Sequence, residues 1–441
     1  MSIKSDKRDK VLKFLKKMIW LYLLLLLFEG ALRKWFLPFL SGPLLLVRDP
    51  LALIILFYGY SYGFLRLNLY LMIMVFATLL SICATFVFGH GNIGICIYGA
   101  RITILHFPLI FIIGNVFDEF DVLKVGRVLL YITIPMTILM ILQFYSPQSA
   151  LVNRGIGGDI EGGGFIGGAL GFYRPPGTFS FISGLTCFYG ITTCFVFYFW
   201  TKPKSINKVV LILSSICVFA AVPFSISRTL FFTTVLTLLF FLFAVSLNPK
   251  NIMKVIGGTL GAMVVLVLLS NIDLFKTPIE AFTVRFEGAN ETEGGVESVL
   301  LGRYLGGMFG AVVDNRNTAF FGEGLGIATN AGSQLFKGYQ RKNHWVEKEW
   351  ERIIYESGLI IGVIIILVRL LLALNLAVSA FKKLFSKDML PWLLLSYCAL
   401  ILPNGQWQTP TTLGFGIFVS GILMACFNKR KVDNENYEAK L

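Results

Sequence analysis

The sequence is poor in charge and has no paired cysteines, and each shortage excludes a class of protein. Only 15% of the 441 residues are charged and 56% are hydrophobic, with a mean hydropathy of +0.74. A chain of this composition cannot cover its surface with polar groups, so most of it must face lipid. The seven cysteines lie in or beside apolar segments without the spacing of a disulfide or zinc framework, and we expect them to be small core residues.

Metal and nucleotide motifs are also missing. The sequence has no Asp-x-Asp pair and no clustered His and carboxylates, so we expect metal-independent chemistry without a cofactor. Nine of the 17 residues from Gly155 to Gly171 are glycine. This segment lacks the flanking strand, helix and lysine of a phosphate-binding P-loop, and we interpret it as a surface loop, with a flexible gate as the alternative. The basic residues are scattered, so we expect no nucleic-acid partner.

Apolar stretches of about 20 residues, the length that crosses a bilayer, recur along the chain. They predict an all-α polytopic membrane protein with about twelve transmembrane helices. The predicted spans are 18–37, 43–63, 67–88, 93–116, 121–144, 179–200, 208–225, 229–247, 254–272, 356–380, 389–403 and 411–427. The first span is not a cleaved signal peptide, because Glu29, Arg33 and Lys34 stand where small residues would be needed.

The positive-inside rule predicts that both termini are cytoplasmic. Under this rule most Lys and Arg fall on the inner segments 1–17, 64–66, 117–120, 201–207, 248–253, 381–388 and 428–441. The net charge of +14 then lies mainly at the cytoplasmic edge, where it would meet anionic membrane lipids. The chain divides into helices one to nine (1–272), an extracytoplasmic loop subdomain (273–355), helices ten to twelve (356–427) and a cytoplasmic tail (428–441).

Arginine-bearing motifs stand at the outer ends of the predicted helices. Residues 173–179 read Tyr-Arg-Pro-Pro-Gly-Thr-Phe, and residues 225–229 read Ser-Ile-Ser-Arg-Thr. Guanidinium groups bind phosphate oxygens in pairs and keep their charge, so Arg174 and Arg228 are predicted to bind a lipid diphosphate; snorkelling to the headgroups is the alternative.

A further arginine, Arg101, lies inside the fourth predicted span. An ionisable group at that depth usually faces a cavity or a charged partner. Arg101 either contacts the lipid phosphate or pairs with an acidic side chain, and both alternatives stay open. His106, deeper in the same span, is expected to be a hydrogen-bonded core residue.

The end of the long loop carries the candidates for acid–base chemistry. Glu349, Arg352 and Glu356 recur at helical spacing and should share one face of a helix. Arg352 is predicted to help bind the diphosphate, and Glu349, Glu356 or His344 to serve as the general base for an acceptor hydroxyl. A salt-bridged helix face is the structural alternative. Burial should raise the pKa of Glu356 more than that of Glu349, because Glu356 is closer to the apolar phase.

Together these motifs resemble the O-antigen polymerase and O-antigen ligase superfamily over roughly residues 90–425. The resemblance rests on the order of residues 174–179, Ser-x-Ser-Arg at 225–228, Gly-x-Gly-x-Gly at 322–326, and a glutamate followed by Gly358 and Gly362. The segment 28–35, Phe-Glu-Gly-Ala-Leu-Arg-Lys-Trp, together with Val-Arg-Asp-Pro at 47–50, also resembles a subset of that superfamily.

The resemblance implies a GT-C-like glycosyltransferase in the bacterial inner (cytoplasmic) membrane. Its substrate would be an undecaprenyl-diphosphate-linked oligosaccharide, polymerised into O-antigen, capsule or exopolysaccharide, with a flippase and a chain-length regulator as partners. His344 lies farther from its Gly-x-x-x-Gly than the ligase histidine, which favours a polymerase over a ligase that transfers glycan to lipid A core. A transporter of lipid-linked oligosaccharides is a further alternative, although internal repeats are missing. A non-catalytic scaffold subunit also stays open.

Overall fold

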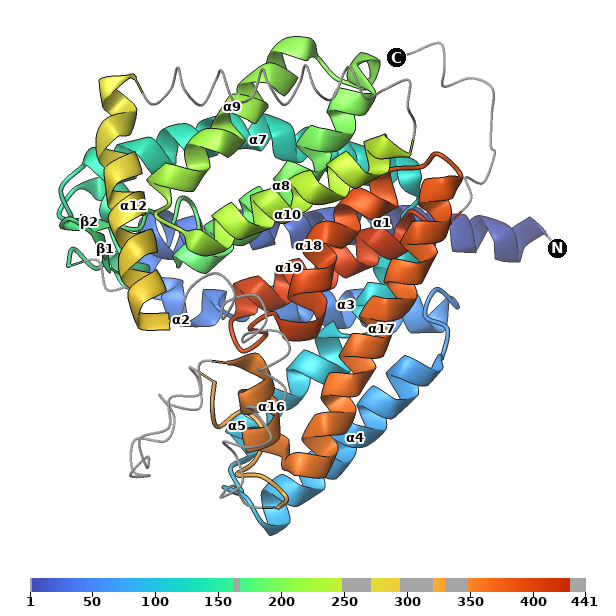
Figure 1. The fold of residues 1–441 in the computed structure, drawn as a ribbon. Helices are drawn as coiled ribbons and strands as arrows, with labels where there is room; N and C mark the ends of the chain where they lie inside the picture. The colour runs from blue at the N-terminus through green and yellow to red at the C-terminus, as the bar shows by residue number, and fades with distance from the viewer. Residues whose placement is uncertain (1, 162–166, 248–270, 294–319, 330–347, 429–441) are drawn as a thin grey trace.

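The computed structural model describes residues 2–161, 167–247, 271–293, 320–329 and 348–428 (Figure 1). The ninth predicted span, His344 and the cytoplasmic tail after Asn428 lie outside these residues, as does most of the predicted loop subdomain. The described chain is mostly helical, which confirms the class predicted from composition.

Within the described residues, seven stretches of helix are long and apolar enough to cross a membrane. Two of them are composite: Pro38–Ser61 joins η2 (Pro38–Leu40), α2 (Ser41–Leu44) and α3 (Arg48–Ser61), and Ile93–Val116 joins α5 (Ile93–Arg101), η3 (Ile102–His106) and α6 (Leu109–Val116). The other five are α4 (Leu69–Val87), α7 (Glu119–Tyr145), α8 (Ile182–Thr201), α10 (Arg228–Ser246) and α17 (Leu359–Phe385).

The remaining helices are shorter or more polar. They are α1 (Ser2–Ala31), which continues into a π-helical turn η1 (Leu32–Phe36), α9 (Lys208–Phe224), α12 (Asp273–Glu293), α16 (Glu349–Ser357), α18 (Leu390–Asn404) and α19 (Pro410–Ala425), with 3₁₀ turns at η4 (Leu151–Asn153), η5 (Ile156–Gly158) and η6 (Pro203–Ser205). Every predicted span within the described residues falls on a helix. The number of twelve transmembrane helices stays a prediction.

Polar residues fix where several helices begin. Asn68 and Asn92 accept the backbone N–H groups of Leu71 and Ile95 through their side chains, over 3.0 and 3.2 Å. α7 starts with a reciprocal pair in which Asp118 and Asp121 each accept the other's backbone N–H. These side chains satisfy N–H groups that a helix leaves without partners in its first turn.

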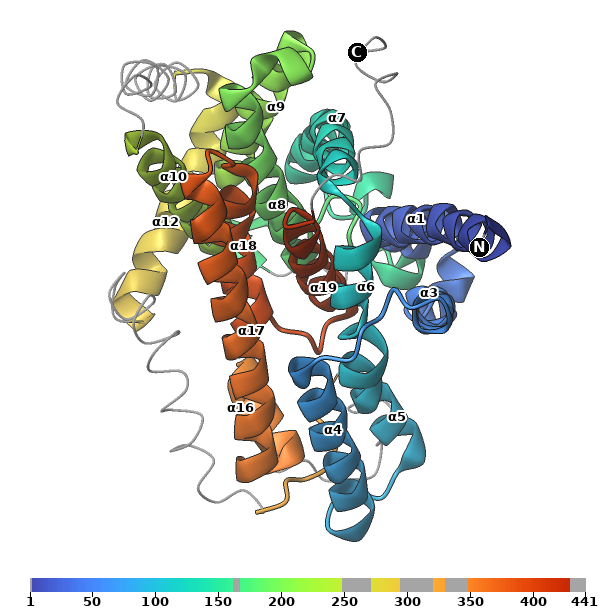
Figure 2. The same ribbon diagram turned by 90° about the vertical axis from the view of Figure 1, so that its right-hand side faces the viewer.

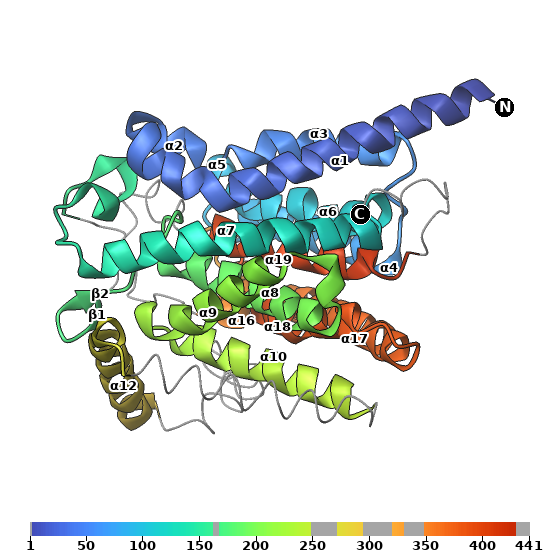
Figure 3. The same ribbon diagram turned by 90° about the horizontal axis from the view of Figure 1, so that it is seen from above.

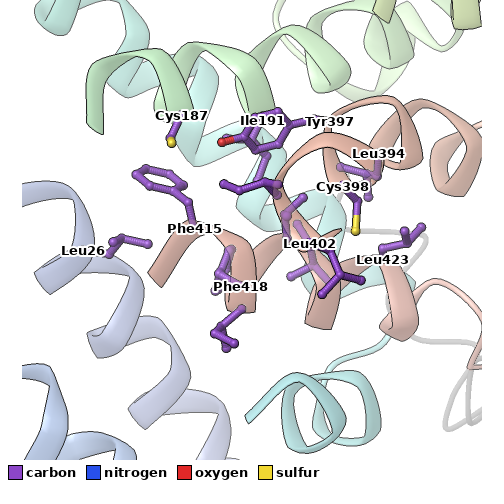
Figure 4. Packing of buried hydrophobic residues seen from close by; sticks show 14 of the residues in the cluster. Leu26, Cys187, Ile191, Leu394, Tyr397, Cys398, Leu402, Phe415, Phe418 and Leu423 are labelled. Atoms are coloured by element: carbon purple, nitrogen blue, oxygen red, sulfur yellow. The ribbon is translucent and has the colours of Figure 1, made fainter. Parts of the chain in front are cut away.

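The core is formed where α8, α18 and α19 meet, with α1 alongside. Figure 4 shows side chains of α18 and α19 packing toward those of α8, among them Leu402, Phe415 and Ile191, all nearly or fully buried. Large apolar side chains exposed on the outer helices, such as Phe57 and Phe76, would face lipid. Five of the seven cysteines are buried as predicted, but Cys217 is half-buried and Cys83 is exposed on α4, so the expectation of a core position was wrong for Cys83.

Polar side chains of α1, of α7 and of the loops beside them meet at one end of the bundle. Lys16 Nζ lies 2.5 Å from the Asp121 carboxylate, and Arg127 Nε donates to the Ser205 carbonyl over 3.0 Å. The Asn428 amide donates to the Phe117 carbonyl over 3.4 Å. We call this the terminal end. The predicted inner segments 1–17, 117–120 and 201–207 therefore lie together.

The opposite end, which we call the loop end, gathers segments that the sequence assigned to the outer side. Trp35 Nε1 donates to the Leu151 carbonyl over 2.9 Å, and the Tyr145 hydroxyl donates to the Leu274 carbonyl over 2.6 Å. α12 stands across this end beside a small β-hairpin, whereas α1 and α3 run side by side along the bundle toward the terminal end (Figure 3).

The hairpin was not predicted, because its strands lie in and just after the glycine-rich segment. Strands β1 (Gly167–Ala169) and β2 (Phe172–Tyr173) pair antiparallel around a two-residue turn at Leu170 and Gly171, both with positive φ. The Phe172 ring stacks on Phe144 of α7, with centroids 4.6 Å apart. Packing of Phe172 on α7 therefore fixes the second strand. The composition of the glycine-rich segment does not reveal this contact.

Candidate functional site

Arg174 follows directly on the hairpin at the loop end. It precedes Pro175 and Pro176, whose rings restrict the backbone. Its side chain is half-buried, and Nε is buried with no hydrogen-bond partner among the described residues. Within the same residues Arg174 forms no ion pair with a carboxylate. A buried guanidinium nitrogen without a hydrogen-bond partner is costly, so an anion with acceptor oxygens would stabilise Arg174.

Arg228 is the first residue of α10. The Ser227 hydroxyl caps the helix by accepting the Leu230 N–H over 3.3 Å. The N-terminus of a 19-residue helix carries partial positive charge, and the guanidinium adds a full one at the same place. Ile226, fully buried just before the cap, has φ +46°. A β-branched residue in this region is strained, and such strain is frequent at functional sites.

A third arginine, Arg285 of α12, completes the group. Its Nη1 donates to the Gly168 carbonyl of β1 over 3.3 Å. Phe282 and Phe286, on either side of it in sequence, contact Phe231 with centroids 5.9 and 5.8 Å apart, which docks α12 against the start of α10. We call Arg174, Arg228 and Arg285 the arginine cluster.

The pKa of Arg174 reflects the positive charges of the other two arginines. Burial, with the positive charges of Arg285 and Arg228, lowers the pKa of Arg174 to about 10. Arg174 therefore remains protonated at neutral pH while it lies near two like charges. Such an arrangement is unfavourable when empty and becomes favourable when an anion with several oxygens binds.

The other predicted candidates form a second group on α16. Arg352 donates to both carboxylates that flank it, with Nη2 at 3.0 Å from Glu349 Oε1 and Nη1 at 2.5 Å from Glu356 Oε2. The predicted shared helical face is thereby confirmed. Arg369 of α17 adds a further bond, from Nη1 to Glu349 Oε1 over 2.6 Å. We call these four residues the glutamate–arginine network.

The glutamate–arginine network lies inside the protein. Glu349 is 1% exposed and Glu356 is 2% exposed. The cavity beside them, lined in part by Arg352 and Arg369, measures about 20 Å³, room for about one water. The network also ties α16 to the loop after α18, because Glu349 accepts the backbone N–H of Trp407 over 3.1 Å. In Figure 2, α16 and α17 follow one another along one line with α4 beside them.

The two carboxylates differ in acidity. Burial alone would raise the pKa of Glu349, but the guanidinium groups of Arg352 and Arg369 outweigh it and lower the pKa. Burial raises the pKa of Glu356, because Arg352 and backbone N–H groups offset it only in part. The predicted order of the two pKa values agrees with these directions, but the predicted cause was wrong, because both carboxylates are almost fully buried and Glu349 differs by its second guanidinium partner, Arg369. Arg352 contacts both carboxylates, so neither is free of a guanidinium partner, as in the salt-bridged alternative for this helix face.

The glycine motif at 322–326 is joined to this network. The Gly324 N–H donates to the Glu356 carbonyl over 3.0 Å, and Glu356 Oε1 accepts the Ala328 N–H over 3.1 Å. Gly358, which separates α16 from α17, has φ +78°, and a Cβ there would lie 2.2 Å from the Phe320 carbonyl oxygen. Any side chain at Gly358 would therefore push this loop away from α16.

Arg101 pairs with an acidic side chain, which is one of the two alternatives predicted for it. Its Nη1 lies 2.6 Å from an oxygen of Asp49, at the start of α3. His106 Nε2 lies 2.9 Å from the other oxygen of Asp49, and the Tyr22 hydroxyl lies 3.3 Å from His106 Nδ1. The expectation for His106 is confirmed. Asp49 already supplies the negative charge that a phosphate would bring to Arg101.

Sequence reasoning missed Arg285 and Arg369. Arg285 is one of nine basic residues in the nearly neutral segment 273–355, and only its aromatic neighbours Phe282 and Phe286, at helical spacing, indicated a docked helix. Arg369 lies in an apolar run where a charged residue indicates a buried partner, and Glu349 is that partner. No group of three or more His, Cys, Asp or Glu residues suited to a metal ion occurs in the part of the chain that the structure describes.

No protein-family model, curated protein or solved structure matches this chain. The fold and the contacts define a mostly helical membrane protein with a cationic cluster at its loop end. The assignment of function therefore depends on the chemistry of this site.

Proposed function

We propose that this protein is a membrane glycosyltransferase that polymerises undecaprenyl-diphosphate-linked oligosaccharide repeats into a surface polysaccharide. The observation that carries the proposal is the arginine cluster, in which three guanidinium groups and a helix N-terminus meet at one end of the bundle. A diphosphate presents several anionic oxygens to such a site, and its lipid tail would lie among the apolar helices. The loop end then faces away from the cytoplasm, and the termini lie in the cytoplasm.

The chemistry of transfer fits this arrangement. Breaking the bond between a sugar and a lipid diphosphate leaves a group that already carries negative charge, so the leaving group needs fixed positive charge and no protonation. Arg174, Arg228 and Arg285 would supply that charge through paired hydrogen bonds. We leave Arg101 and Arg352 out of the diphosphate site, because carboxylates already neutralise them.

The general base stays a proposal among three residues. Of the two carboxylates in the network, Glu356 is the better candidate, because its raised pKa lets it take a proton more readily than Glu349. The cavity beside Glu356 has room for about one water, and this water would relay the proton from the acceptor hydroxyl. His344, which lies outside the described residues, is the third candidate. If transfer required His344, the ligase alternative would be favoured.

Analysis of the lipid carrier in cells that lack this protein tests the function. The undecaprenyl-linked glycans are extracted and sized. We expect single repeat units to accumulate, because repeats would be made and exported but not joined. Long lipid-linked chains would indicate a ligase instead, and an unchanged pool would contradict both enzymes and favour a transporter or a scaffold.

A further inference from the structure

The segment 28–35, which the proposed chemistry leaves without a task, packs directly against the loop that carries Arg174. We propose that this segment is a brace for residues 174–180, with Lys34 as the positioning residue that holds Arg174 in place for the diphosphate. The role of the brace in transfer rests on the proposed function, whereas its effect on the loop does not.

The backbone of Gly177 is held from two sides, by the brace and by α7. Lys34 Nζ donates to the Gly177 carbonyl over 2.6 Å. On the other side Gln143 of α7 accepts the Gly177 N–H through Oε1 over 2.8 Å and donates to the same carbonyl through Nε2 over 3.2 Å. Gly177 therefore has both of its backbone polar groups fixed by side chains from distant helices.

Three further contacts, one of them to the adjacent Leu27, which we include in the brace, extend it along the loop. Arg33 Nη1 donates to the Ser180 hydroxyl over 3.1 Å, and the Thr178 hydroxyl donates to the Leu27 carbonyl over 2.7 Å. Gly30 allows this close approach, since a Cβ there would lie 2.5 Å from both the Ser180 nitrogen and the Thr178 carbonyl oxygen. The loop is thus pressed against the backbone of α1.

The chemistry of Lys34 points to positioning as its task. Its side chain is 1% exposed and forms no ion pair with a carboxylate among the described residues. Apart from Gly177 it contacts the Trp35 ring, with Nζ 4.4 Å from the centroid. Burying an ammonium group without a carboxylate is costly. Its neighbour Arg33 differs, because Glu29 lies 3.6 Å from it.

The brace acts on Arg174 through the backbone. The charges that lower the pKa of Arg174 are those of Arg285 and Arg228, so Lys34 does not act on Arg174 as a nearby charge. Only Pro175 and Pro176 separate Arg174 from Gly177. The proline rings allow little rotation of the backbone. A shift at Gly177 would therefore move the guanidinium away from the leaving diphosphate.

The test compares Lys34→Met and Thr178→Val with a control, Lys13→Met, which removes an exposed lysine from the same helix. Thr178→Val is nearly isosteric and removes one hydrogen bond of the brace, so it keeps the proposal testable if Lys34→Met does not fold. Each purified protein is followed by hydrogen exchange of the amides of residues 177–180 and by steady-state transfer from a lipid-linked repeat.

We expect faster exchange at residues 177–180 in both brace variants and no change in the control. For transfer we expect kcat to fall about 10- to 100-fold, since small misplacements of a catalytic group have effects of this size, with a smaller change in KM for the donor. Lys34→Arg should restore part of kcat by returning a donor to Gly177. Unchanged exchange would overturn the brace, and faster exchange with unchanged kcat and KM would overturn its role in positioning.

Failure of the proposed function would look different. A wild-type protein with no transfer activity would refute the glycosyltransferase, while the exchange data would still decide whether the brace holds the loop. In that case the affinity of each variant for inorganic pyrophosphate is measured in place of its kcat. Binding at least 10-fold weaker in Lys34→Met than in Lys13→Met would support positioning of Arg174, and equal binding would overturn it.

Discussion

Two groups of arginines in this protein are both buried or half-buried, yet they differ in what surrounds them. Arg352 lies between two glutamates and contacts both, and Arg369 pairs with one of the same carboxylates. Arg174 has no carboxylate partner among the described residues and lies instead near two further guanidinium groups. Carboxylates offset the charges of the first group, whereas in the second group two neighbouring guanidinium groups act on Arg174.

The charge of its neighbours indicates whether an arginine has a structural role or a binding role. The presence of the arginine alone does not. Breaking a buried ion pair leaves an uncompensated charge and destabilises the fold. Removing one of several like charges relieves repulsion and weakens only the binding of an anion. Substitutions in the two groups should therefore have different effects, from a large loss of stability to a small gain.

Arg352→Met should have the largest effect on stability. It would leave Glu356 without its guanidinium partner and Glu349 with one partner in place of two, at a cost of about 3–5 kcal/mol. Thermal unfolding of the purified variant in detergent measures this loss, with Arg66→Met as the control because Arg66 is exposed. An unfolding temperature equal to that of the wild type would mean that the network is not a structural element.

Arg174→Gln should abolish polymer formation while the protein remains folded. Loss of one group that stabilises developing charge lowers kcat by about 10²–10³-fold. Arg174→Lys should restore little, because an ammonium group cannot reproduce the planar, two-pronged geometry. The length of the surface polysaccharide, measured at equal protein expression, checks both variants. Normal chains made by Arg174→Gln would remove this residue from the mechanism.

The two glutamates should give opposite pH dependences of stability. Glu349 has a lowered pKa, so it contributes stability that is present above its ordinary pKa of 4.5 and is lost as the pH falls through the folded value. Glu356 has a raised pKa, so the folded protein loses stability as the pH rises above 4.5 toward the folded value. A tenfold change in an acid dissociation constant on folding corresponds to about 1.4 kcal/mol of stability.

Glu349→Gln and Glu356→Gln isolate these contributions. Relative to the wild type, the stability deficit of Glu349→Gln should shrink on acidification, and that of Glu356→Gln should shrink as the pH rises. Unfolding temperatures between about pH 3 and pH 8 provide the measurement, because the loss at Glu349 falls below its ordinary pKa of 4.5. Parallel pH profiles for the two variants would show that the carboxylates do not differ as described.

The smallest effect is a gain in stability. Without a bound anion, Arg174→Gln removes repulsion from Arg228 and Arg285 and should stabilise the protein by about 1 kcal/mol. The same substitution at Arg66, an exposed residue outside the cluster, should be neutral. A destabilised Arg174→Gln protein would indicate that Arg174 has a structural role comparable to that of Arg352.

The sequence could predict those features that depend on local pattern. Hydropathy located the apolar helices within the described residues but not α12, which lies in the predicted loop subdomain. Helical spacing placed Glu349, Arg352 and Glu356 on one face. It could not decide whether Arg101 or Arg352 was neutralised, because their partners Asp49 and Glu349 are chosen by packing between helices. Arg285 and Lys34 depend likewise on the contact of α12 with α10 and of α1 with residues 174–180, which lie far apart in the chain.

The most direct test of the central claim is the binding of undecaprenyl diphosphate to the purified protein in nanodiscs. The measurement compares the wild type with Arg174→Gln, Arg285→Gln and the control Arg66→Gln. We predict that affinity falls at least 10-fold in each of the two cluster variants, since each loses a charge-assisted contact, and is unchanged in the control. Equal affinity in all four proteins would contradict the assignment of the arginine cluster as a diphosphate site.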